Sequence, residues 1–163
     1  MRPIVICLTL LLLSVACENS TDPLIGIGGT GGGAITQAQA AGNWSFTVRK
    51  TATLPCSGGS LADGQLITAN LNVLADGTVS ASTSSWQNPP TTLVRPISGL
   101  VRLSDGFTDL ILTASSGSAS AMELRGTMTA TSTFTGTLTD PAAGSSPMFS
   151  VGGCEYTTTG TKA

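Results

Sequence analysis

The chain has 163 residues, a formal net charge of −2, no histidine, and charged side chains at only 10% of its positions. This length suffices for one domain, and the slightly acidic balance offers no basic surface for DNA or RNA. Without histidine there is no Ser-His-Asp triad, and the sequence contains no GxSxG, SxxK, HExxH or P-loop motif. We therefore expect no enzyme, and neither a metal site nor a cofactor.

Residues 1–16 have the layout of an export signal. Arg2 gives a positive start, residues 4–13 are an apolar run, and residues 14–16 are Ser-Val-Ala, small side chains that suit a cleavage site. The run is shorter than the ~20 apolar residues that a membrane-spanning helix needs. An internal membrane or core helix is the alternative, but a run at the extreme N-terminus that ends in small residues favours a cleaved signal peptide.

The residues LSVAC at positions 13–17 resemble the bacterial lipobox, in which small residues precede a cysteine that becomes lipidated. Ser14 stands where the family prefers leucine, whereas Ala16 fits the pattern. The resemblance implies a lipoprotein that is cleaved before Cys17 and carries fatty acyl chains such as palmitate there, which anchor it to a membrane. Glu18 implies sorting to the outer membrane of the cell envelope, facing the periplasm or the exterior. Ordinary cleavage after Ala16, leaving a secreted protein with a free thiol, is the alternative.

The 4 cysteines can all be accounted for in such a protein. Cys7 leaves with the signal and Cys17 takes the lipid. Cys56 and Cys154 remain, and in an exported chain an even number of cysteines predicts a disulfide bond. A zinc site is a poor rival, because two distant cysteines without histidine do not make a tetrahedral ligand set.

Residues 17–42 comprise the lipidated cysteine and a Gly-rich stretch without a periodic apolar pattern, which predicts a flexible, disordered tether. The folded domain is expected at 43–163. There, Trp44, Phe46 and Val48 alternate with polar residues, every odd position from 127 to 139 is threonine, and Asp-Gly pairs mark tight turns. The predicted strands are 43–51, 65–74, 78–86, 93–103, 107–114, 118–129, 133–139 and 148–159.

About eight antiparallel strands with short connections predict an all-β fold, a small up-and-down β-barrel that leaves no free sheet edge. The cysteines favour closure, because Cys56 follows the first predicted strand and Cys154 lies in the last. A β-sandwich that pairs its first and last strands is the alternative.

Gly42, Asn43 and Trp44 resemble the GxW motif that opens the barrels of lipocalins and related calycins. The resemblance implies a small hydrophobic ligand inside the barrel. The side chains that would line such a site are Trp44, Phe46, Ile67, Leu71, Met122, Phe134 and Tyr156. The alternative is that the same side chains simply fill the interior.

Two functions therefore remain open for a membrane-anchored protein of the envelope. One is a binding module for a small apolar ligand. The other is a structural or interaction protein that acts through its surface on another envelope component. Trp86 precedes Gln-Asn-Pro-Pro at 87–90, and we expect it at a loop, either as an exposed anchor for a partner or folded back onto the core.

Overall fold

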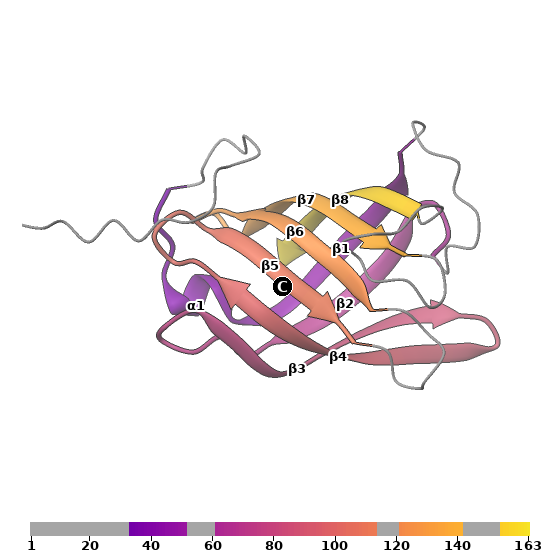
Figure 1. Cartoon of the computed structure of the whole chain (residues 1–163), viewed down its shortest axis with the longest axis horizontal. Helices are drawn as coiled ribbons and strands as arrows, with labels where there is room; N and C mark the ends of the chain where they lie inside the picture. Colours follow the sequence, from indigo (N-terminus) through magenta and orange to yellow (C-terminus); the bar gives the residue numbers. More distant parts are fainter. Residues whose placement is uncertain (1–32, 52–60, 114–120, 142–153) are drawn as a thin grey trace, which may run out of the picture.

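A computed structural model describes residues 33–51, 61–113, 121–141 and 154–163. In these residues eight antiparallel strands form one closed barrel in chain order, and β1 pairs with β8 (Figure 1). The predicted up-and-down barrel is confirmed, and the sandwich alternative is wrong. The elements are α1 (Gln37–Ala40), β1 (Gly42–Lys50), β2 (Gln65–Leu71), β3 (Thr78–Asn88), β4 (Thr91–Val101), β5 (Phe107–Leu112), β6 (Met122–Met128), β7 (Thr133–Asp140) and β8 (Cys154–Lys162).

The alternating pattern of the strands sorts side chains between the interior and the outer surface. In β1, Trp44, Phe46 and Val48 are buried in the interior. The threonines at odd positions of β7 and β8 face outward and lie directly opposite one another, as in the pairs Thr135–Thr159 and Thr137–Thr157, whereas Thr158 is buried. Period-two alternation thus gives an apolar core inside a hydroxyl-rich outer surface.

The structure describes residues that precede the predicted domain boundary at residue 43. Ile35 and Ala40 are buried, and Thr36 caps α1 with a reciprocal capping box to Gln39. We call residues 35–41 the strap. Our expectation of a flexible tether up to residue 42 was wrong for this part, because a four-residue helix has no sequence periodicity and forms only with tertiary contacts.

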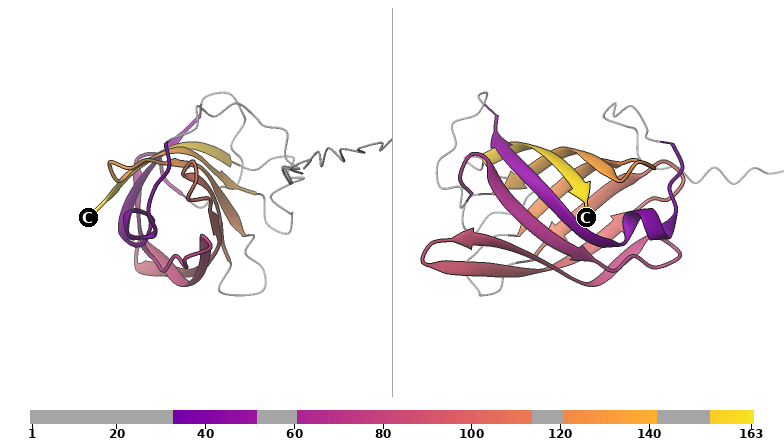
Figure 2. Two further views of the ribbon diagram at one scale, coloured as in Figure 1. Left: turned by 90° about the vertical axis from the view of Figure 1, so that its left-hand side faces the viewer. Right: turned by 180° about the vertical axis from the view of Figure 1, so that it is seen from behind.

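The strap lies at one end of the barrel, as Figure 2 shows. It makes one hydrogen bond to each of the turns at this end: from Ile35 N to Leu103 O at 2.8 Å, from Gln37 Nε2 to Val73 O at 2.7 Å, and from Gln39 Nε2 to Ala130 O at 2.8 Å. The Nζ of Lys162, at the end of β8, donates to the carbonyl of Ala38. We call this the strap end and the opposite end, where the β3–β4 hairpin turns, the hairpin end.

Candidate functional site

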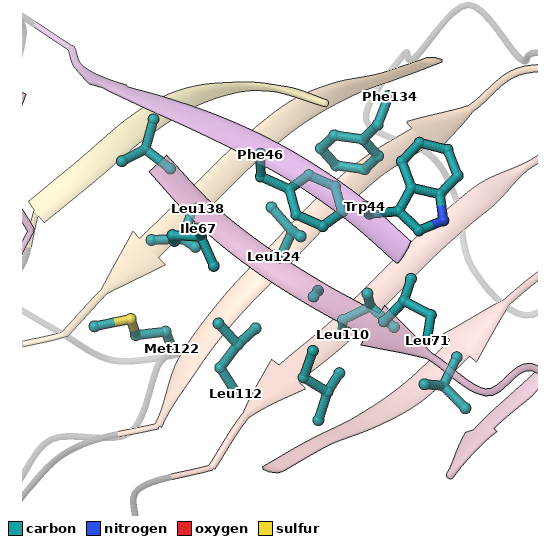
Figure 3. Packing of buried hydrophobic residues seen from close by; sticks show 14 of the residues in the cluster. Trp44, Phe46, Ile67, Leu71, Leu110, Leu112, Met122, Leu124, Phe134 and Leu138 are labelled. Carbon is teal, nitrogen blue, oxygen red and sulfur yellow. The ribbon is translucent and has the colours of Figure 1, made fainter. Parts of the chain in front are cut away.

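The side chains predicted to line a ligand site all lie in the barrel interior, and the solvent-exposed fraction of each is 2% or less. Figure 3 shows most of them converging from β1, β2, β6 and β7. The ring of Trp44 stacks on Phe46 with centroids 5.9 Å apart, and Phe46 meets Phe134 edge to face at 5.3 Å. These aromatic contacts fix the position of the rings within the core.

Glycines provide the space that these rings occupy. A Cβ atom on Gly160 would lie 2.5 Å from Cδ1 of Phe46, and one on Gly136 would lie 2.7 Å from Cζ of Phe134. Gly126 pairs with Gly136 across β6 and β7, and Phe134 covers both. Neighbouring aromatic rings therefore occupy the space beside these glycines.

A void among the described side chains of the interior has a volume of about 10 Å³, close to the volume that one water-sized sphere occupies. Pockets for drug-sized ligands span roughly 300–1,000 Å³. Of the predicted lining residues, only Phe46 and Ile67 border this void. The described part of the barrel is thus a packed core in this conformation. The residues that border the void are Phe46, Ile67, Ala69, Ser84, Ile97, Leu110, Leu112, Leu124 and Leu138.

Trp86 is not at a loop, so that expectation was wrong. Strand β3 continues to Asn88, and the alternation within it turns Trp86 inward, where its exposed fraction is 2%. Its indole Nε1 has no hydrogen-bond partner among the described residues. The guanidinium Cζ of Arg95 lies 5.2 Å from the centroid of the Trp86 ring, a cation–π geometry.

Arg95 belongs to a polar part of the interior that the sequence analysis did not identify. Arg95 and Asp140 are buried, with exposed fractions of 7% and 5%. Burial lowers the pKa of Arg95, and the charge of Asp140 opposes that shift. Burial, followed by the charge of Asp140, raises the pKa of Tyr156, whose hydroxyl donates to Leu61 O at 3.1 Å. The sequence of β4 could have predicted the burial of Arg95, because strand alternation places it on the same face as the apolar Leu93 and Ile97.

Two of the other carboxylates lie on the outer surface near Arg125. Arg125 Nη2 is 2.8 Å from Asp109 and 2.6 Å from Glu123. Burial raises the pKa of Glu123, while the charge of Arg125 opposes the shift. Because the Arg125 side chain is 52% exposed, such pairs contribute little to stability. Within the described ranges, no group of three or more His, Cys, Asp or Glu side chains has an arrangement that could hold a metal ion.

A groove on the outer surface was also not predicted. It has a volume of about 350 Å³ and lies over β1, β2 and β3. Asn70 Nδ2 donates to Asn43 Oδ1 at 2.7 Å, and the hydroxyls of Thr68 and Ser85 are 2.8 Å apart. Strand alternation in the sequence predicts that Thr68 and Asn70 face outward, but it does not predict the curvature of the sheet. The groove is lined by Asn43, Trp44, Ser45, Thr68, Ala69, Asn70, Thr83, Ser85 and Ala163.

Of the predicted cysteine sites, Cys17 and Cys56 lie outside the described residues, and Cys154 is buried at the start of β8. The end of β1 lies against this part of β8. Thr51 N donates to Glu155 O at 3.1 Å, and its hydroxyl donates to the same oxygen at 2.9 Å. Thr51, five residues before Cys56, thus contacts Glu155, the residue next to Cys154. The predicted pairing of the first and last strands requires this proximity.

In comparisons with known proteins, no family model, curated protein or solved structure matches this chain. Among the residues described by the structure, no helix combines the length and the apolar character needed to cross a membrane.

Proposed function

We propose that the protein is a lipid-anchored, non-enzymatic protein of the bacterial cell envelope whose barrel acts through its outer surface. The observation that carries this proposal is the packing of the interior, where the void is about 10 Å³. A small ligand would have to displace core side chains to enter. The hydroxyl-rich outer surface, in contrast, is already exposed and held by paired strands.

The proposed anchor is Cys17, on the strength of the lipobox-like residues 13–17. Two or three acyl chains, each methylene contributing ~0.8 kcal/mol on burial, hold a protein lastingly at a membrane. The strap supports this arrangement, because the chain from Cys17 joins the barrel at a segment tied to several turns. The proposed location is the outer membrane, facing the periplasm or the exterior.

The anchor is tested by expressing the full chain in a bacterium that processes lipoproteins. We expect the protein in the membrane fraction, with an intact mass that begins at Cys17 and includes acyl chains. The Cys17→Ser variant should leave that fraction. An intact Met1 terminus, or a processed terminus without acyl mass, would contradict the proposal.

The runner-up function is a small apolar ligand held in a lipocalin-like barrel, which rests on Gly42-Asn43-Trp44 and the apolar interior. Ligand binding to the native state raises the melting temperature. We expect no rise with medium-chain or long-chain fatty acids, measured on the Cys17→Ser protein. A rise that saturates with ligand concentration would overturn the surface-acting proposal in favour of the pocket.

A further inference from the structure

A groove on the outer surface lies over β1, β2 and β3 and is lined mainly by small polar side chains. It is a hollow of about 350 Å³, within the size range of small-ligand sites. Hydroxyl or carboxamide groups line it from each strand: Asn43 and Ser45 from β1, Thr68 and Asn70 from β2, and Thr83 and Ser85 from β3.

The lining is held in place before any ligand arrives. Asn43 is paired with Asn70 in the β1–β2 register, and their carboxamides share a hydrogen bond of 2.7 Å. Thr68 is paired with Ser85 in the β2–β3 register, with their hydroxyls 2.8 Å apart. Sites built on paired strands lose little conformational freedom on binding, and the groups still have unused donors and acceptors.

The chemistry of the lining selects the class of ligand. No side chain that lines the groove is charged, so it lacks the cations that phosphate or carboxylate ligands require. Carboxamides and hydroxyls each donate and accept, which matches the hydroxyl groups of a sugar. We propose that this groove binds a neutral glycan, which deepens the surface-acting function proposed above by naming its ligand.

The experiment uses the full chain carrying Cys17→Ser, labelled with ¹⁵N, and titrates neutral oligosaccharides of glucose and of N-acetylglucosamine. We expect saturating amide shifts at Asn43, Thr68, Asn70 and Thr83. Asn70→Ala removes a central donor and acceptor and should weaken binding about tenfold, the equivalent of about 1.4 kcal/mol. Thr83→Ala, which removes one hydroxyl of the lining, should weaken it less.

Thr135→Ala is the matched control, because Thr135 is an exposed threonine of β7 outside the groove. It should leave the affinity unchanged. Shifts confined to other faces, equal binding by Asn70→Ala and the parent, or no saturating shift with any neutral oligosaccharide would each overturn the proposal. The binding test uses protein without the lipid, so its result can be interpreted even if the proposed lipid anchor at Cys17 is wrong. A ligand-induced rise in melting temperature with fatty acids tests the barrel interior separately.

Discussion

Trp44 and Trp86 are both buried, but their indole nitrogens are in different environments. Nε1 of Trp44 donates to Ala40 O at 2.8 Å, while Nε1 of Trp86 has no partner within the described part of the chain. Removing one partner of a buried hydrogen bond costs about 1–3 kcal/mol. We expect Trp44→Phe to lower the free energy of unfolding by about 1–2 kcal/mol more than Trp86→Phe, as measured by urea denaturation. An equal or larger loss in Trp86→Phe would show that its indole nitrogen has a partner.

Asp105 lies in the β4–β5 turn and accepts hydrogen bonds from Arg102 Nε at 2.9 Å and from Arg102 Nη2 at 2.6 Å. The hydrogen bonds from Arg102 lower the pKa of Asp105 below its usual value of 3.8, while burial opposes that shift. A carboxylate whose pKa is lower in the folded state contributes stability above its unfolded pKa and loses it as the pH falls.

We therefore expect Asp105→Asn to be less stable than the parent at pH 7 by a few tenths of a kcal/mol, because the pair is solvent-exposed. The gap should narrow as the pH falls below the unfolded pKa of the carboxyl group, ~3.9, and close below its lowered pKa in the folded state. Thermal unfolding across this range measures it. In an Arg102→Gln background the substitution should have a smaller effect at neutral pH, and a gap that widens on acidification would contradict the assignment.

At the scale of elements, the strap is a short segment with contacts to distant turns. Thr36 caps α1 by accepting a hydrogen bond from Gln39 N at 3.2 Å, and an N-cap of this kind contributes about 1 kcal/mol. Its loss should loosen α1 and uncover the neighbouring Trp44.

We expect Thr36→Ala in a Trp86→Phe background to increase the quenching of Trp44 fluorescence by acrylamide, because Trp44 is then the only indole in the chain. Thr159→Ala, which alters an exposed threonine of β8, should not change the quenching. Unchanged quenching in Thr36→Ala would mean that the other hydrogen bonds of the strap hold it without the cap.

The strands themselves were predictable because alternation is local. The apolar residues of β1 and the threonines of β7 each occupy every second position of their strand. Because a strand is pleated, the apolar residues of β1 therefore face the interior and the threonines of β7 face the outer surface. The predicted strand ended at 86, whereas β3 continues through Gln87 and Asn88 to the turn at Pro89-Pro90. The strap was missed because its hydrogen-bond partners, at Val73, Leu103 and Ala130, are distant in the sequence.

For the whole molecule, we predict a Cys56–Cys154 disulfide that links the first and last strands of the barrel. In the chain-entropy model, linking residues about 100 positions apart stabilises the native state by about 4–5 kcal/mol, less any strain. The Cys56→Ala, Cys154→Ala double variant should therefore unfold at a much lower urea concentration than the oxidised parent. Reductant should destabilise only the parent, and peptide mapping without reduction should recover the linked pair. Two titratable thiols in the native protein would contradict the prediction.

By itself, the sequence was sufficient to predict an all-β barrel, its approximate strands, the buried positions of the ligand-lining candidates and the meeting of first and last strands. These depend on local alternation and on chain order. Only the tertiary structure decided that the interior is filled, that Arg95 and Asp140 share it, and that a polar groove lies over β1, β2 and β3. The size of a void and the curvature of a surface depend on how side chains from several strands meet, which no single stretch of sequence specifies.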